Sequence, residues 1–235
     1  MKKGLTELVF ILDRSGSMSG LVQDTIGGYN SLLKKQKQEP GEAIVTTVLF
    51  DDQYEILHDR INLKGVEPIT EKEYSVRGMT ALLDAIGRTV DKINNAQKHT
   101  AEDERAESVM FVITTDGMEN ASREYRYDKI RGMIERQKEE YGWEFLFIGA
   151  NINAIETAAK FGIAPDRAVN YHADSIGTAV LYDSVSEAVR CMRGAPSMPI
   201  AASWKDKIDK DFKSRKSKSQ WICAKPGTNK QSQGD

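Results

Sequence analysis

Residues 8–17 read LVFILDRSGS, so five consecutive apolar residues lead directly into an acid and two serines. A short apolar run of this kind predicts a buried strand. Asp13, Ser15 and Ser17 then follow where that strand ends. In open parallel sheets, ligands bind beyond the carboxyl ends of the strands, and oxygen side chains there suit hard cations. Taken alone, however, Asp-x-Ser-x-Ser is more often a plain strand-to-helix loop.

Two further segments place oxygen side chains in a similar local setting. Residues 109–115 form a second apolar run, which predicts a buried strand and ends on Asp116. Gly117 follows directly and permits a tight exit from that strand. Between the two strands, Thr80 precedes an apolar pattern at helical spacing over residues 81–86, which predicts a loop or cap position at a helix start.

Together these three segments resemble the metal-ion-dependent adhesion site of von Willebrand factor type A domains. The family pattern is Asp-x-Ser-x-Ser, then a distant Thr in a Gly-x-Thr context, then a distant Asp followed by Gly. The matching residues, in chain order, are Asp13, Ser15, Ser17, Thr80 and Asp116. The resemblance covers residues 5–193 and is strongest in FILDRSGSM, GMTALLDAI and FVITTDGMEN. It is closest to the bacterial or phage-like intracellular type of the family.

The resemblance implies a role for each of these residues. Ser15 and Ser17 would bind the ion directly, and Thr80 directly or through water. Asp13 and Asp116 would mainly accept hydrogen bonds from metal-bound water. The expected cation is Mg²⁺, with Mn²⁺ and Ca²⁺ as alternatives. A cation with so few directly bound anions stays electrophilic, so we expect an Asp or Glu of a partner protein to complete its coordination.

The remaining sequence predicts alternating strands and helices. Short β-rich runs and longer amphipathic stretches follow one another along the chain. Strands are expected at 8–12, 43–50, 54–61, 107–115, 143–150 and 168–170, and helices at 21–38, 80–94, 127–141, 153–161 and 175–192. The runs at 43–50 and 54–61 are close enough to form a hairpin at a sheet edge. The predicted class is therefore α/β: a doubly wound, Rossmann-like sheet, mostly parallel with one antiparallel edge strand, and helices on both faces.

Length and composition agree with one α/β domain. The chain has 235 residues, is 40% hydrophobic and carries a net charge of −2. Its two cysteines, Cys191 and Cys223, match no metal-binding or redox spacing and are interpreted as free thiols. The basic start Met1-Lys2-Lys3 is followed by too short an apolar run for a secretory signal, and no segment approaches the length of a membrane span. We therefore expect a cytoplasmic protein with no membrane partner.

The last forty or so residues differ in character. Residues 195–235 hold nine Lys or Arg and four Asp, a balance of +5, which leaves −7 for residues 1–194. We expect a type A domain over 1–194 and a basic, partly disordered tail over 195–235, with a transient helix at 205–210. Trp204 and Trp221 are expected to dock back on the domain. Because the positive balance is modest, nucleic acid is not the expected partner.

Two other functions remain open. A metal-dependent phosphohydrolase would use Asp13 as nucleophile, but Ser15 occupies the position where such enzymes carry a second carboxylate for acid and base chemistry. A metal-independent scaffold would keep the fold and bind its partner through helix faces. No domain in the chain identifies the partner, although intracellular members of the family often act beside AAA-type ATPases. The main prediction is therefore a cation-dependent protein-binding module without enzymatic activity.

Several other polar residues are weaker candidates for a functional site. Asp51 and Asp52 lie between two predicted strands, where paired acids usually serve a turn rather than a second metal site. His172 and Asp174 follow the last short strand, and their spacing matches no zinc or catalytic pattern. Arg14, between two expected ligands, is predicted to face solvent. The loops 51–53 and 120–126 are expected to set partner specificity.

Overall fold

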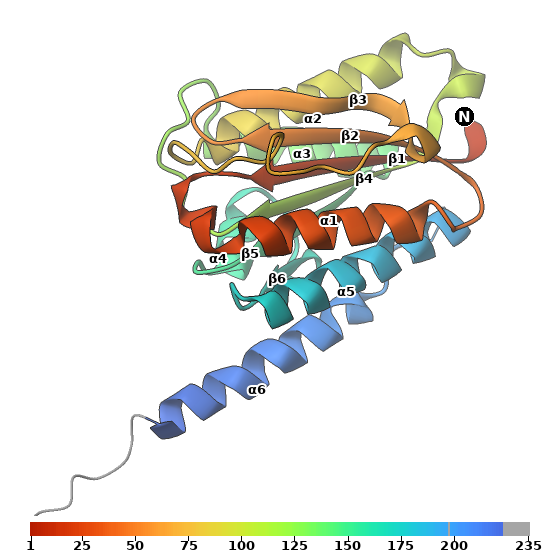
Figure 1. The fold of residues 1–235 in the computed structure, drawn as a ribbon. Coiled ribbons are helices and arrows are strands. Elements are labelled where there is room, and N and C mark those ends of the chain that lie inside the picture. Colours follow the sequence, from red (N-terminus) through yellow and green to blue (C-terminus); the bar gives the residue numbers. More distant parts are fainter. Residues whose placement is uncertain (197, 223–235) are drawn as a thin grey trace, which may run out of the picture.

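A six-stranded sheet with strand order β3-β2-β1-β4-β5-β6 forms the centre of the protein (Figure 1). The computed structural model describes residues 1–196 and 198–222, the last seven of these through their backbone only. The strands are β1 (Lys2–Asp13), β2 (Glu42–Phe50), β3 (Tyr54–Asn62), β4 (Ala106–Thr115), β5 (Glu144–Gly149) and β6 (Ala168–Asn170). β3 pairs antiparallel with β2 at one edge, and the other pairs are parallel. The predicted fold class and edge hairpin are confirmed.

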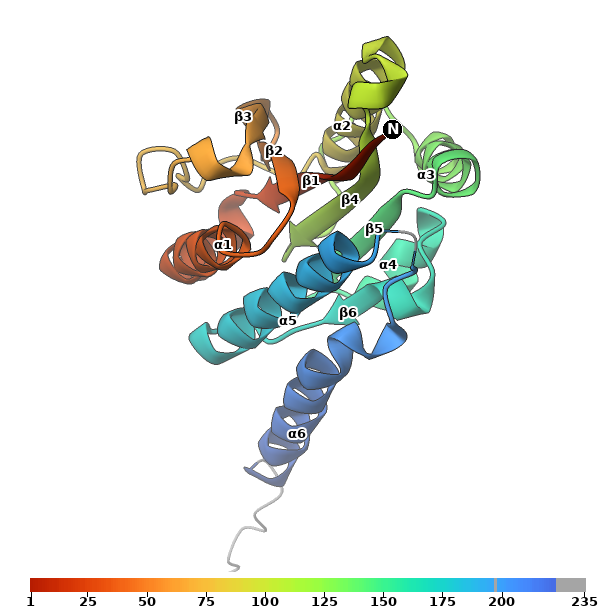
Figure 2. The ribbon, with the colours of Figure 1, turned by 90° about the vertical axis from the view of Figure 1, so that its right-hand side faces the viewer.

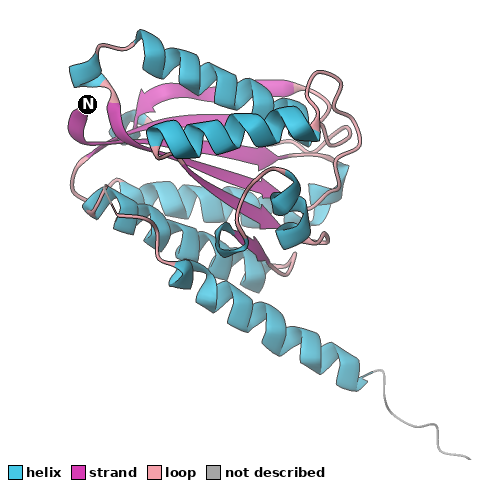
Figure 3. Ribbon diagram, turned by 180° about the vertical axis from the view of Figure 1, so that it is seen from behind, coloured by secondary structure: helices cyan, strands magenta, loops and turns pink. Residues whose placement is uncertain are grey.

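Helices cover both faces of this sheet. They are α1 (Val22–Gln36), α2 (Leu82–His99), α3 (Tyr127–Tyr141), α4 (Ala154–Lys160), α5 (Ser175–Gly194) and α6 (Asp206–Ile222). α1 and α5 lie on one face, and α2, α3 and α4 lie on the other (Figures 2 and 3). The ends of the predicted elements differ most at β1, which begins six residues earlier than the apolar run, and at α2, which continues to His99 rather than Asn94.

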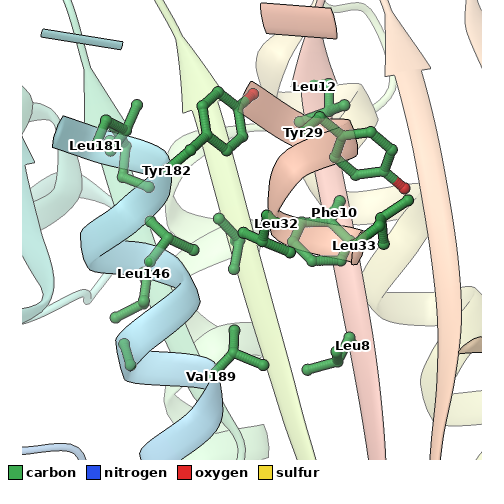
Figure 4. Packing of buried hydrophobic residues seen from close by; sticks show 14 of the residues in the cluster. Leu8, Phe10, Leu12, Tyr29, Leu32, Leu33, Leu146, Leu181, Tyr182 and Val189 are labelled. Carbon is green, nitrogen blue, oxygen red and sulfur yellow. The ribbon is translucent and has the colours of Figure 1, made fainter. Parts of the chain in front are cut away.

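The apolar run in β1 is continuous because both faces of the strand are buried. Leu8 and Phe10 point into the core beneath α1 and α5, whereas Val9 and Ile11 belong to the core beneath α2 and α3. Figure 4 shows the first of these cores, where the ring of Phe10 meets Tyr29 of α1 edge-on at a centroid distance of 5.3 Å. One strand thus contributes to two hydrophobic layers.

A glycine allows α1 and α5 to pack closely. A Cβ atom added at Gly28 would lie 2.1 Å from Cδ2 of Tyr182, much closer than real atoms approach. Helix-interior glycine has a cost of roughly 0.5–1 kcal/mol relative to alanine. At Gly28 the Tyr182 ring occupies the space that a side chain would need. Gly28 therefore has a packing role.

The direction of the chain across the sheet reverses between β1 and β4. The chain proceeds from β1 towards β2 and β3 on one side, and from β4 towards β5 and β6 on the other. Such a reversal leaves space for a ligand beyond the carboxyl ends of the two central strands. Asp13 ends β1, and Asp116 directly follows β4. The fold therefore brings two predicted site residues to the carboxyl ends of the two central strands.

The first part of the predicted tail forms a helical extension. Residues 202–205 make a short 3-10 helix and α6 continues to Ile222, so the helix expected at 205–210 is part of a longer one. Trp204 is buried, and its indole N–H donates to the carbonyl oxygen of Asp166 at 2.8 Å, which confirms its docking. The Trp221 side chain, Cys223 and residues 223–235 lie outside the described part of the chain.

No helix within the described ranges is long and apolar enough to cross a membrane.

Candidate metal site

Three hydroxyl groups meet beyond the carboxyl ends of β1 and β4. The Oγ atoms of Ser15 and Ser17 lie 3.2 Å apart, and the Thr80 hydroxyl donates to Ser15 Oγ at 3.0 Å. Ser15 directly precedes the short 3-10 helix Gly16–Leu21 after β1, and Ser17 lies in this helix. Thr80 comes from the loop before α2, 65 residues after Ser15. We call these three groups the hydroxyl cluster.

The two acids lie beside the hydroxyl cluster. Asp116 accepts a hydrogen bond from Ser17 Oγ at 2.5 Å. Asp13 accepts from the backbone N–H of Ser15 at 2.7 Å and from the hydroxyl of Thr115 at 2.5 Å. All five predicted site residues are therefore brought together by the fold.

Burial governs the electrostatics of both acids. It raises the pKa of Asp13 to about 6, although hydrogen bonds from Ser15 and Thr115 act in the opposite direction. It also raises the pKa of Asp116, against the hydrogen bond from Ser17. No Lys, Arg or His within the described ranges forms an ion pair with either carboxylate. Both acids therefore lie where a bound cation would favour their charged forms.

The donor set and its spacing suit a small divalent cation. In an octahedral Mg²⁺ site the metal–oxygen distances are about 2.0–2.1 Å, so adjacent oxygens lie about 2.9 Å apart. For Ca²⁺ the metal–oxygen distances are about 2.3–2.6 Å, so adjacent oxygens would lie about 3.3–3.7 Å apart. The observed separation of 3.0 Å is nearer the Mg²⁺ value and that of 3.2 Å is nearer the Ca²⁺ range, so the spacing suits either cation. Elsewhere, no group of three or more His, Cys, Asp or Glu within the described residues is arranged to hold a metal.

Gly117 keeps the space beside the hydroxyl cluster open. A Cβ atom at this position would lie 2.9 Å from Thr80 Oγ1, 3.1 Å from Ser17 Oγ and 3.7 Å from Ser15 Oγ. A methyl group there would contact all three hydroxyls. The Asp-Gly pair that ends the second strand segment thus has two functions: the acid contributes an oxygen, and the glycine leaves room.

Side chains outside the sequence motif fix the loop that follows Asp116. Asn120 accepts the Thr80 N–H through Oδ1 at 2.9 Å, and its own N–H donates to the Thr80 carbonyl at 3.0 Å. Asp84, in the first turn of α2, accepts three backbone N–H groups from residues 123–125. Neither the role of Asn120 nor that of Asp84 in fixing this loop was predicted from the sequence. An acid within the otherwise apolar start of α2 was the available signal for Asp84.

Arg14 does not face solvent, so the prediction for this residue was wrong. Its side chain is 2% exposed, and its guanidinium donates to Asp51 at 3.2 Å and to Glu55 at 2.7 Å. Asp51 is fully buried and also accepts from Arg77 at 2.7 Å. The Asp51 backbone carbonyl accepts the N–H of Ala81, next to Thr80. This Asp51 ion-pair cluster therefore joins the β1 loop, the β2–β3 turn and the Thr80 loop.

The remaining polar candidates have structural partners. His172 stacks on Phe212, with ring centroids 4.6 Å apart. Asp174 caps α5 by accepting the N–H of Gly177 and pairs with Arg215. Cys191 is a free, exposed thiol, as predicted. None of these residues is a sequence neighbour of Ser15, Ser17 or Thr80.

Comparisons with solved structures agree with this fold. Von Willebrand factor type A from Catenulispora acidiphila aligns with a TM-score of 0.54 at 13% identity, over 79% of this chain and 42% of that chain. Proximal thread matrix protein 1 from the mussel byssus, with a zinc-occupied MIDAS motif, aligns with 0.54 at 14% identity, over 79% and 46%. The manganese-loaded TRAP protein of Plasmodium vivax aligns with 0.53 at 17% identity, over 77% and 73%.

These alignments define the class of the protein as a doubly wound α/β domain. The chain has the von Willebrand factor type A fold. It spans less than half of the mussel protein and of the Catenulispora protein. No protein-family profile and no curated protein sequence matches the chain.

Proposed function

We propose that this protein is a divalent-cation-dependent protein-binding module. In this proposal Ser15, Ser17 and Thr80 hold Mg²⁺ or Mn²⁺, and Asp13 and Asp116 orient metal-bound water. An Asp or Glu of a partner protein completes the coordination. The observation that carries the proposal is the convergence of three hydroxyl oxygens, 3.0 and 3.2 Å apart, beside two buried acids.

The neutral character of the hydroxyl cluster is what leaves the cation reactive towards a partner. Hydroxyl groups contribute no formal charge, so a bound divalent ion keeps most of its positive charge. An incoming carboxylate would therefore gain a strong electrostatic interaction with the cation. The solved relatives with zinc and manganese support the choice of a divalent metal.

The contacts of Asp13 argue against the phosphohydrolase alternative. A nucleophilic carboxylate needs a free oxygen that can reach substrate. The Asp13 side chain is 1% exposed, so a substrate could not reach its oxygens. Ser15 Oγ contacts two other hydroxyls rather than a general base. We therefore propose a non-enzymatic role.

Isothermal titration of the chelator-treated protein with Mg²⁺ and Mn²⁺ tests the metal site. We expect saturable binding in the parent and its loss in Ser15→Ala. Ser19→Ala is the matched control, because Ser19 is exposed on the 3-10 helix Gly16–Leu21 that follows Ser15, and this change should leave binding unchanged. Gly117→Ala should weaken binding at least tenfold, because its methyl group would contact the hydroxyl cluster.

Equal metal binding by the parent and by folded Ser15→Ala would refute this site. The metal-independent scaffold is separated by partner capture with Mn²⁺ or with chelator: the proposed module loses its partner when the metal is removed, and the scaffold keeps it. The cytoplasmic location, the AAA-type ATPase partner and the domain boundary at residue 194 stay predictions.

A further inference from the structure

Two methionines are exposed directly beside the candidate metal site. Met79 precedes Thr80 and is 53% exposed, and Met118 follows Gly117 and is 75% exposed. Most large apolar side chains of the described chain are buried, and single exposed ones are ordinary. These two differ because each adjoins a loop residue of the site. A flexible, polarisable thioether suits a contact surface that adapts to a partner.

The two methionines lie on loops that are held together. Hydrogen bonds in both directions join Thr80 to Asn120, so the segment that carries Met118 runs beside the segment that carries Met79. On the other side, the N–H of Gly16 donates to the carbonyl of Gly78 at 3.2 Å. Because Gly16 and Gly78 have no side chains, only their backbone atoms lie next to the methionines. We call Gly16, Gly78, Met79 and Met118 the site rim.

Three charged side chains near the site rim have partners within the protein, whereas the exposed Asp52 carboxylate lies against Gly78. Arg14 points inward to the Asp51 ion-pair cluster, and Arg77 pairs with the same acid. The Glu119 carboxylate accepts the N–H of Leu83 at 2.9 Å and two further N–H groups in its own loop. All four residues of the site rim are uncharged. A partner would therefore meet the cation beside two exposed methionines, with the Asp52 carboxylate next to Gly78.

We infer that the partner presents an acidic residue flanked by apolar side chains, which pack against Met79 and Met118 while the carboxylate binds the metal. This inference rests on the proposed function and specifies the chemistry of the partner. A partner segment with charged residues on both sides of its acid would leave the methionines in contact with water or with buried charge. The apolar flanks supply affinity that the carboxylate alone cannot.

Three capped tripeptides test this inference: acetyl-Leu-Asp-Leu-amide, acetyl-Ala-Asp-Ala-amide and acetyl-Leu-Asn-Leu-amide. Each is titrated into the full chain saturated with Mn²⁺ and followed by ¹³C-methyl methionine NMR. Each buried methylene should tighten binding about fourfold. With several buried on each flank, we expect the Leu-Asp-Leu peptide to bind at least about tenfold more tightly than Ala-Asp-Ala. The Asn peptide should not bind, and the methyl signals of Met79 and Met118 should move.

The double variant Met79→Ser, Met118→Ser should bind Mn²⁺ like the parent but lose the preference for leucine flanks. Met198→Ser, which changes an exposed methionine after α5, is the control and should keep the preference. Equal affinity for the two Asp peptides would overturn the inference and leave the proposed function intact. Metal binding without binding of either Asp peptide would overturn both, and unchanged preference in the double variant would refute the role of the methionines.

Discussion

Replacing Asp51 with alanine is expected to destabilise the protein and to weaken its metal site together. The Asp51 carboxylate is fully buried and receives the guanidinium groups of Arg14 and Arg77 as well as the N–H of Gln53. Without it, Arg14 keeps only Glu55, whose side chain is 47% exposed. The variant would therefore leave a buried cation with one partly solvated partner.

The size of the effect follows from these contacts. Removing one partner of a buried ion pair typically costs about 3–5 kcal/mol. Because Glu55 remains and Arg77 can turn to solvent, we expect about 2–3 kcal/mol for Asp51→Ala. For a domain of this size, that loss corresponds to a melting temperature lower by about 4–12 °C. Because the cluster joins the β1 loop to the Thr80 loop, metal affinity should fall as well.

Urea unfolding and calorimetric Mn²⁺ titration of the same variant measure both effects. Asp52→Ala is the matched control, since Asp52 is the exposed neighbour in the same turn and surface substitutions usually change stability by no more than about 0.5 kcal/mol. If Asp51→Ala were no less stable than Asp52→Ala, the cluster would not support the fold. If stability fell but metal affinity did not, the cluster would not position Thr80.

Three further outcomes are expected. Gly28→Ala should lower the free energy of unfolding by about 1–3 kcal/mol because its Cβ would overlap the Tyr182 ring. In the control Gly27→Ala, the new Cβ meets nothing within 4 Å, so this variant should be more stable by about 0.5–1 kcal/mol. Equal effects of the two changes in urea unfolding would contradict the close packing of α1 and α5. Burial raises the pKa of Glu7 above its ordinary value, although Arg60 opposes this, so the folded state holds the proton more tightly than the unfolded state. The parent should therefore lose stability relative to Glu7→Gln as pH rises from 4 to 7, and a pH-independent difference would argue against the shift. Mg²⁺ at 100 times its Kd should raise the free energy of unfolding by about 2.7 kcal/mol. This gain should appear as a higher melting temperature that a chelator abolishes. Calorimetric binding without that rise would mean that the unfolded chain binds Mg²⁺ with comparable affinity.

The sequence pattern predicted the fold because its signals are local. Apolar runs such as residues 8–12 are too short for helices and too continuous for surface strands, so they predict buried strands of a parallel sheet. The predicted α3 and β6 have the observed bounds. The bounds of β1 and α2 were less accurate, since the polar residues at their ends are placed by hydrogen bonds to distant segments.

The tail illustrates a different limit. Its composition resembles that of a poorly ordered segment, with many Lys and Ser residues and few apolar ones. The structure nevertheless has a 17-residue helix there, because Trp204 and Ile208 are buried in the core under α1 and α5. Two well-placed apolar residues can anchor a segment whose average composition does not predict order.

The residue types at the candidate site, and their position at strand ends, are properties of the amino-acid sequence. Asp13, Ser15 and Ser17 follow one buried strand, and Asp116 follows another, whatever the rest of the chain does. Tertiary structure decided the separations of the hydroxyl oxygens and the inward turn of Arg14. Arg14 and Asp51 are 37 residues apart in the sequence, and a local sequence pattern cannot reveal that the two side chains form a buried ion pair. The long-range pairing of charges removed from water, rather than local preference, determined that side chain's position.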